Sequence, residues 1–325
     1  MKTSRSALLL GFMSVAILSA ASAGAQSFPV RPVRFILPSG PGGGTEIVTR
    51  MIAQKLTVRW GQPAIVENRP GGNGLVAVQA LKSLPADGHS LLLVNPFIGA
   101  NAALFGKLPY DYKADFQPVA VAFHNYFYFV ARSGSALDSV QNVIRTARAQ
   151  PGGLNYGAPI SSISQRLWME VFNRQLGLSM VFVGYKSAGA TVQALAAGDI
   201  QLMNVGLPAI EGMVRQGKVK ILAVGAPRRA AVTPDVPTVD EVAGTRGFVS
   251  DSWVGYVTHA QAPSAAVRDL HSAILAALRE PELVAFFRQN DYSIMDLSPP
   301  EFGRLIDADT ERYTRYINEL KLKPE

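Results

Sequence analysis

Short apolar runs rich in β-branched residues alternate with longer helical patterns along most of this chain of 325 residues. The runs expected to form strands are 33–37, 90–94, 126–130, 180–183, 200–204, 220–224 and 253–258. The segments between them with the spacing of helices are 45–59, 139–150, 162–176, 188–197 and 207–216. Because strands that alternate with helices build largely parallel sheets, this pattern predicts an α/β fold.

The first residues have the layout of a secretory signal peptide. Lys2 and Arg5 precede an apolar run, 7–20, that ends near the small residues Ala23, Gly24 and Ala25. The run is shorter than the roughly 20 apolar residues that span a bilayer. We therefore expect residues 1–25 to be removed, with cleavage after about Ala25, and the mature chain to be periplasmic.

Composition narrows the classes of protein. The chain has no cysteine, which excludes disulfides and cysteine metal sites. The leader carries two of the 31 basic residues and none of the 24 acidic ones, so the mature net charge is 29 minus 24, or +5. This mild excess fits an acidic small molecule. Lysines and arginines are scattered rather than clustered, which argues against nucleic acid as a partner.

Two extended segments suggest how the chain divides. A mature chain of about 300 residues exceeds the usual size of one core, which favours two lobes. Residues 117–132 are apolar and aromatic and lack turn residues, so they could cross between lobes, and residues 248–258 could return. We expect a discontinuous first lobe, 26–125 and 250–325, and a second lobe, 126–249. Two amphipathic helices, one from Ser264 and one over 300–320, are expected to cover the first lobe.

The most informative local motif is a glycine-rich turn that follows a strand and opens a helix. It reads Pro-Ser-Gly-Pro-Gly-Gly-Gly-Thr-Glu over residues 38–46. Unpaired amides at the helix start, with Thr45 as a possible cap, could donate to an anion. The spacing fits neither a P-loop nor a dinucleotide fingerprint, and a tight turn without a ligand remains an alternative. A second glycine turn, 68–74, also leads into a helix.

Two polar motifs in the expected second lobe also precede helices. Residues 157–164 supply three serine hydroxyls, and residues 185–189 add the phenol of Tyr185 and the ammonium of Lys186. Such groups would bind a carboxylate well. The alternative is that these serines cap helices and Lys186 is solvated.

Catalytic motifs are absent. The chain has no His-Glu-x-x-His, no Gly-x-Ser-x-Gly and no histidine cluster with metal spacing. His271 lies beside an apolar helix stripe and is interpreted as a packing residue. We therefore expect neither enzyme activity, nor a metal, nor a cofactor. A ligand-binding subunit of an extracytoplasmic sensor and a secreted ester or amide hydrolase remain as alternatives.

The order of several motifs resembles one known family. Pro-Val-Arg-Pro-Val-Arg at 29–34 is followed by the turn at 38–46, Glu-Asn-Arg-Pro-Gly at 67–71 and Pro-Ala-Asp-Gly-His at 85–89. Further landmarks are Leu-Pro-Tyr-Asp at 108–111, Gly-Tyr-Lys at 184–186, Ala-Gly-Asp at 197–199 and Pro-Asp-Val-Pro-Thr-Val at 234–239. Together they cover the mature chain, which is similar to the substrate-binding receptors of tripartite tricarboxylate transporters, often called Bug proteins.

The resemblance implies a two-lobed, type II periplasmic-binding-protein fold in which each lobe is a mainly parallel sheet flanked by helices. The ligand would be a small organic acid, such as a carboxylate, dicarboxylate, aromatic acid or amino acid, and the partner a membrane permease. We expect a monomer. Family members commonly hold a ligand carboxylate through waters bound to first-lobe backbone. The matching positions are Ser39, Gly40, Pro41, Gly42, Gly43, Gly44, Thr45, Glu46, Ser161, Ser162, Ser164, Tyr185, Lys186, Ser187, Ala188, Gly189 and Asn204.

Three positions depart from the family pattern. Ser39 replaces a usual aromatic residue, and Glu46 replaces a common aspartate at the helix start. Val205 and Gly206 replace a common Asp-Asn pair. The side chains that select the ligand are therefore the part of the site that the resemblance predicts least.

Overall fold

The computed structural model describes residues 28–324, so the predicted signal peptide lies outside the described residues. Two sheets organise the chain. The first has the strand order β11-β4-β10-β3-β1-β2, with β1 at Val33–Leu37, β2 at Ala64–Asn68, β3 at Ser90–Val94, β4 at Phe116–Tyr126, β10 at Asp251–His259 and β11 at Tyr292–Ser293. The second has the order β7-β6-β8-β5-β9, with β5 at Tyr128–Arg132, β6 at Asn155–Pro159, β7 at Val181–Tyr185, β8 at Leu202–Val205 and β9 at Val219–Val224.

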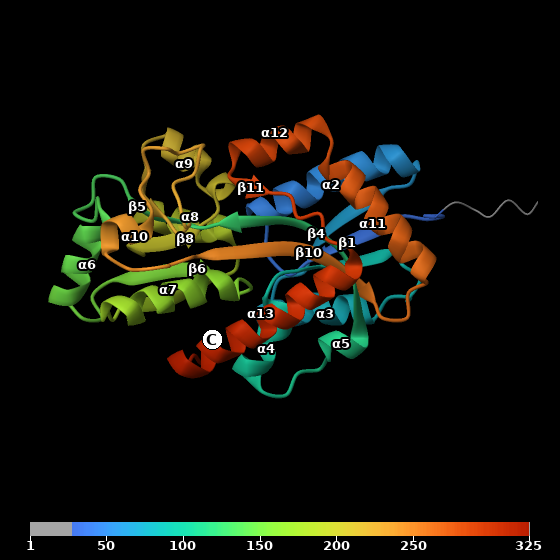
Figure 1. The fold of residues 1–325 in the computed structure, drawn as a ribbon, viewed down its shortest axis with the longest axis horizontal. Helices are drawn as coiled ribbons and strands as arrows, with labels where there is room; N and C mark the ends of the chain where they lie inside the picture. The colour runs from blue at the N-terminus through green and yellow to red at the C-terminus, as the bar shows by residue number, and fades with distance from the viewer. Residues whose placement is uncertain (1–27, 325) are drawn as a thin grey trace, which may run out of the picture.

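Helices cover both faces of each sheet (Figure 1). Those packed with the first sheet are α2 (Gly44–Trp60), α3 (Leu75–Lys82), α4 (Phe97–Phe105), α5 (Tyr112–Asp115), α11 (Ser264–Leu278), α12 (Pro281–Gln289) and α13 (Pro299–Leu320), with the short turn η2 at Gly72–Gly74. Those packed with the second are α6 (Val140–Ala149), α7 (Ile163–Leu176), α8 (Ala188–Ala197), α9 (Glu211–Arg215) and α10 (Val239–Ala243), with η3 at Leu207–Ala209. We call each sheet with its helices the first and the second lobe. The α/β two-lobed fold predicted from the sequence is confirmed. The prediction of mainly parallel sheets is wrong, because β4, β10 and β11 in the first sheet and β5 in the second pair with their neighbours in antiparallel orientation.

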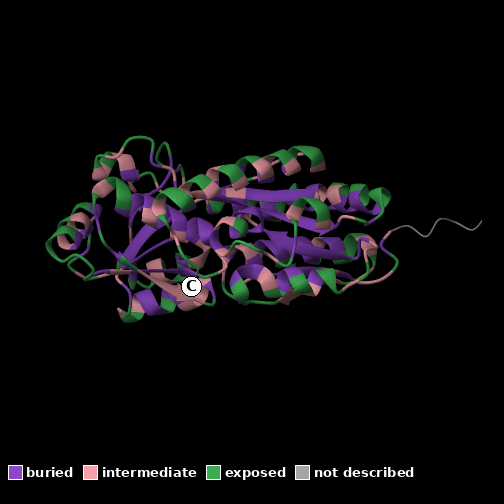
Figure 2. Ribbon diagram, turned by 90° about the horizontal axis from the view of Figure 1, so that it is seen from below, coloured by how far each residue is buried: buried purple, intermediate pink, exposed green. Residues whose placement is uncertain are grey.

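The core of the first lobe follows from side-chain alternation in β1. Val33, Phe35 and Leu37 pack in one cluster with α2 and α11, whereas Ile36 packs in another cluster with α3 and α4. Successive side chains of a strand point to opposite faces, so an apolar run can fill both. Figure 2 shows the buried strands enclosed by helices whose outer faces are exposed.

The lobes are joined where β4 and β10 run antiparallel across the molecule (Figure 1). β4 ends at Tyr126, and β5 begins two residues later in the other sheet. At the junction the Phe127 amide donates to the Ser250 carbonyl at 2.8 Å, and the Gly225 amide donates to the Phe127 carbonyl at 2.9 Å. A strand predicted over 126–130 is therefore wrong in its bounds, because the chain changes sheets at Phe127.

The predicted strands 33–37 and 90–94, the helix 188–197 and the helix starting at Ser264 are confirmed. The predicted helix 207–216 is wrong in part, because a 3₁₀ turn and the short α9 replace it. β6 was not predicted from the sequence, because its asparagine, glycine and proline are poor strand formers. It forms because β7 and β8 pair with it on either side.

None of the helices between residues 28 and 324 combines the length and apolarity that a membrane span requires. Within the same residues, no three histidine or carboxylate side chains gather as a metal site would need. The His271 ring donates a 2.8 Å hydrogen bond from Nδ1 to the Val119 carbonyl, in keeping with its interpretation as a packing residue.

Candidate functional site

A cavity with about 710 Å³ of empty space, including its open mouth, lies between the two lobes. Its lining comes from the ends of β1, β3, β4 and β8 and from the starts of α2, α7 and α8. The lining residues are Pro38, Ser39, Gly40, Gly43, Gly44, Thr45, Leu93, Asn95, Asn125, Phe127, Pro159, Ser161, Ser162, Gln165, Ala188, Val205, Gly206, Ala209, Ser252, Val254 and Tyr292. None of these residues carries a charged side chain.

The first-lobe glycine turn brings the start of α2 to this cavity. Gly43, in an extended conformation, is the residue that precedes the helix, and no side chain caps it. The possibility that Thr45 caps the helix is therefore wrong, because Thr45 is the second helical residue. The amides of Gly44 and Thr45 cannot bond within the helix and have no other acceptor among residues 28–324. They carry the positive end of the helix dipole.

Glu46 stabilises the glycine-rich turn at 38–46 through hydrogen bonds. Its side chain is buried, and one carboxylate oxygen accepts the Gly42 amide at 2.8 Å. The other oxygen accepts two hydrogen bonds from Arg50, at 2.7 and 2.9 Å. Since Glu46 does not line the cavity, its negative charge is turned away from a bound anion.

The second-lobe serines have different roles. Ser161 and Ser162 line the cavity, and the Ser162 side chain makes no capping bond although it precedes α7. Ser187 caps α8, because its hydroxyl accepts the Ala190 amide at 3.1 Å. The alternative that serines serve only as caps therefore describes Ser187 and not Ser162.

Replacing Ser187 with alanine should lower the free energy of unfolding by about 1 kcal/mol, because the Ala190 amide loses its acceptor. Ser162→Ala is the matched control, and we expect a change below about 0.5 kcal/mol. Urea denaturation of both variants measures the difference. Equal losses of unfolding free energy in the two variants would contradict the assignment of Ser187, and not Ser162, as a helix cap.

Other predicted site residues lie beside the cavity without lining it. The Ser164 hydroxyl is buried and accepts a 2.8 Å hydrogen bond from the Tyr313 hydroxyl. The Asn204 side chain donates to Ser250 at 3.1 Å, and the backbone carbonyl of Asn204 accepts from the Gln165 side chain. Tyr185 is half-buried, and the Lys186 side chain is exposed.

The two lobes touch at the mouth of the cavity. The Gly40 amide donates to the Lys186 carbonyl at 3.3 Å, so this contact uses the backbone of Lys186. A Cβ on Gly42 would lie 3.4 Å from the Cα of Gly189, so the two backbones approach each other closely. Pro41 belongs to the same contact, since a Cβ on Gly189 would lie 3.4 Å from its carbonyl oxygen. The two lobes are thus in direct contact beside the cavity.

Several lining residues were not predicted from the sequence, namely Asn95, Asn125, Phe127, Gln165, Ser252 and Tyr292. Asn95 had a usable signal, because it directly follows the carboxyl end of β3, where open α/β sheets place ligands. Tyr292 had none, because its two-residue strand lacks any local pattern.

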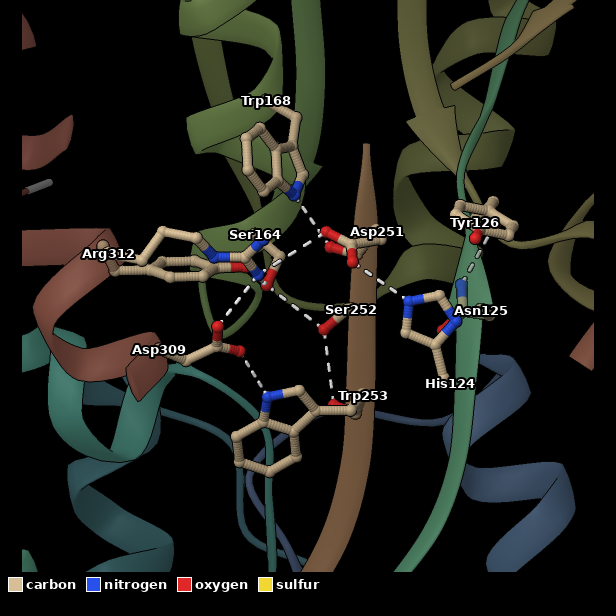
Figure 3. A network of polar contacts seen from close by, with 11 residues as sticks. His124, Asn125, Tyr126, Ser164, Trp168, Asp251, Ser252, Trp253, Asp309 and Arg312 are labelled. Carbon is tan, nitrogen blue, oxygen red and sulfur yellow. Dashed lines mark hydrogen bonds and ion pairs between the residues drawn. The ribbon is translucent and has the colours of Figure 1, made fainter. Parts of the chain in front are cut away.

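Behind the cavity, polar side chains connect the crossing strands to α7 and α13 (Figure 3). Asp251 pairs with His124 at 3.0 Å, and its carbonyl accepts the Trp168 indole N–H at 2.7 Å. The hydroxyls of Ser252, which lines the cavity, and Ser164 lie 3.2 Å apart. This network therefore reaches from the cavity wall to both lobes.

The same network ends in a partly buried ion pair on α13. Asp309 accepts the Trp253 indole N–H at 2.6 Å and pairs with Arg312 at 3.0 Å. Burial raises the pKa of Asp309 even though Arg312 and Trp253 act in the opposite direction. The Arg312 guanidinium also lies over the Trp168 ring, 5.3 Å from its centre. The contact between Arg312 and Trp168 connects α13 to α7 of the second lobe.

Comparison with known proteins gives a consistent result. A family described as "Tripartite tricarboxylate transporter family receptor" matches residues 48–322. A UPF0065 protein from Bordetella pertussis is 30% identical over 98% of both chains. Protein BugT from the same organism is 26% identical over 99% of both.

Solved structures of the same kind superimpose well. The R. palustris protein Rpa4515, solved with adipate, has a TM-score of 0.87 and 27% identity, covering 92% of this chain and 100% of its own. MatC from Rhodopseudomonas palustris, solved with bound malate, has a TM-score of 0.83 and 27% identity, covering 89% and 100%. BugD, at 21% identity and a TM-score of 0.85, covers 92% and 100% and shares the fold.

Proposed function

We propose that this chain, which belongs to the tripartite tricarboxylate transporter receptor family, captures a small organic carboxylate between its lobes and delivers it to a membrane permease. The family consists of periplasmic solute-binding receptors and not of enzymes. The observation that supports the proposal is the meeting of the starts of α2, α7 and α8 in one cavity without charged side chains.

A carboxylate suits this cavity for electrostatic reasons. Helix N-termini from both lobes present unpaired amides and the positive ends of their dipoles. Ser39, Thr45, Ser161 and Ser162 add hydroxyls, and ordered waters can bridge to the backbone almost as favourably as direct contacts. Since no Lys, Arg or His among the described residues lines the cavity, we propose that the anion is held without a salt bridge.

The relatives suggest which acids to test first. Adipate and malate, present in the two structures named above, are both dicarboxylates. We propose the same class for this chain, because helix starts lie on both sides of the cavity and could each receive one carboxylate. Aromatic acids and amino acids form the other arms of a screen.

Delivery requires the protein to change shape on binding. A ligand shifts the open and closed forms only through contacts that differ between them, so residues of both lobes must touch it. We propose that residues 26–125 and 250–325 close against residues 126–249, and that the mature chain works in the periplasm as a monomer. Gly40, Gly42 and Gly189 then form the contact at the closed mouth.

A thermal-shift screen of residues 26–325 against mono-, di- and tricarboxylates, aromatic acids and amino acids tests this function. A ligand at 100 times its dissociation constant should stabilise the closed protein by about 2.7 kcal/mol. A saturable shift with a chemically intact acid is the expected result. No shift with any acid, or consumption of a compound, would contradict the receptor function.

Replacing Ser162 with alanine should weaken binding of the selected acid by about tenfold, because a hydroxyl that can donate to a carboxylate is lost. Lys186→Ala is the matched control. Its side chain is exposed and its carbonyl makes the interlobe contact, so affinity should change less than about twofold. Titration calorimetry measures both. Unchanged affinity in Ser162→Ala would remove this residue from the site.

A further inference from the structure

The hydroxyl of Tyr292 lies in the cavity without a protein partner. The Tyr292 ring is buried and stacks on Phe123, with ring centres 4.4 Å apart and planes 10° from parallel. Phe286 and Phe287 contact its other edges. The hydroxyl makes no hydrogen bond with any residue in the range 28–324, and burial raises the pKa of this phenol. A buried tyrosine hydroxyl normally has a partner.

Two glycines, one from each lobe, leave space for this hydroxyl. A Cβ on Gly44, at the start of α2, would clash with it. A Cβ on Gly206, just before η3 of the second lobe, would lie 3.0 Å from it. The hydroxyl therefore lies between the first-lobe helix start and the second-lobe wall, where an anion at the α2 amides would be within reach.

The residue before Tyr292 contacts the second lobe. Asp291 has a left-handed backbone, with a φ of 58°, which aspartate tolerates better than most residues. Its carboxylate accepts a 2.9 Å hydrogen bond from the hydroxyl of Tyr128. Tyr128 belongs to β5 of the second sheet, is fully buried and does not line the cavity.

These two contacts are joined by a very short segment. In β11, Tyr292 pairs with Asn125 and Ser293 pairs with His124 of β4, the strand that crosses between the lobes. Asn125 itself lines the cavity. Because Asp291 and Tyr292 are consecutive residues, a movement of Tyr292 also moves Asp291 relative to Tyr128.

We propose that β11 couples ligand binding to lobe closure, with Tyr292 donating a hydrogen bond to the ligand and Asp291 holding the second lobe through Tyr128. This inference rests on the proposed function and deepens it, because it names a binding residue and the link by which occupancy favours the closed form. Tyr128 is then a positioning residue that raises affinity without touching the ligand.

The first test is the affinity of Tyr292→Phe, which keeps the ring and removes the hydroxyl. We expect binding of the tightest acid of the carboxylate panel, with adipate and malate as the first probes, to weaken about tenfold. Tyr126→Phe is the matched control. Its hydroxyl makes no hydrogen bond within the described part of the chain and does not line the cavity, so affinity should change less than about twofold.

The second test separates coupling from a merely structural role. Tyr128→Phe should weaken binding about fivefold to tenfold, speed dissociation, and leave a larger radius of gyration by X-ray scattering at saturating acid. The double variant, Tyr128→Phe with Tyr292→Phe, should lose less affinity than the product of the losses measured for the two single variants. Urea denaturation and circular dichroism check that each variant is folded.

The outcomes are distinct. If the wild type binds an acid and either Tyr292→Phe or Tyr128→Phe keeps its affinity within twofold, the coupling proposal is wrong while the receptor function stands. If Tyr128→Phe loses stability but no affinity, Tyr128 is structural and the coupling is likewise wrong. If the wild type binds no acid, the proposed function fails and this inference fails with it.

Discussion

Gly44→Ala is expected to weaken carboxylate binding by at least about tenfold. The added methyl group would clash with the Tyr292 hydroxyl and would lie 3.3 Å from Pro208 of the second lobe. Tyr292 cannot retreat easily, because Phe123, Phe286 and Phe287 surround its ring. Overpacking at such a site costs about 1–3 kcal/mol, and here the groups that must move are the cavity wall and the α2 start.

Two variants make this prediction specific. Gly212→Ala adds a methyl group where no atom lies within 4 Å, so calorimetry should give wild-type affinity. Gly44→Ala combined with Tyr292→Phe removes the clashing hydroxyl and should recover part of the loss caused by Gly44→Ala alone. Wild-type affinity in Gly44→Ala would contradict the placement of the α2 start against Tyr292.

Asp309→Ala should give the largest loss of stability, about 3 kcal/mol in the free energy of unfolding at pH 7. The substitution leaves the Trp253 indole N–H without its acceptor and the partly buried Arg312 without its nearest carboxylate. Removing one member of a buried pair costs about 3–5 kcal/mol, and the partial exposure of Arg312 places the expectation at the lower end. Glu311→Ala, an exposed acid on the same helix, should change stability by less than about 0.5 kcal/mol.

The difference in unfolding free energy between the wild type and Asp309→Ala should depend on pH, because of the pKa of Asp309. Burial raises its folded pKa above the usual 3.8, so the native chain binds this proton more readily than the unfolded chain. The contribution to stability is fully present below the unfolded pKa and is lost as pH rises through the folded pKa. The gap between wild type and Asp309→Ala should therefore widen as pH falls from 7 toward about 3.8. Urea denaturation across this range measures it, and a gap that narrows would contradict the assignment.

The sequence predicts best where local chemistry determines structure. The turn at 38–46 follows a strand whose residues fill both faces of a sheet, and its glycines approach a second-lobe loop closely at Gly40 and Gly42. Both the strand β1 and the helix after the turn could therefore be predicted from these residues alone.

The direction of side chains at the cavity could not be predicted in the same way. Ser162 and Ser164 are two residues apart, and a helix rotates about 100° per residue, so only Ser162 faces the cavity. Tyr292 reaches the cavity because its strand pairs with β4, far away in sequence. Such contacts depend on tertiary packing, which leaves no local pattern.

We propose that both lobes of the closed protein hold one carboxylate ligand. A crystal structure of residues 26–325 with the tightest acid from the screen tests it most directly. We expect a carboxylate bonded, directly or through one water, to the Gly44 and Thr45 amides, with Ser161 or Ser162 contacting the same molecule. An acid bound outside this cavity, or held by one lobe alone with the mouth open, would contradict it.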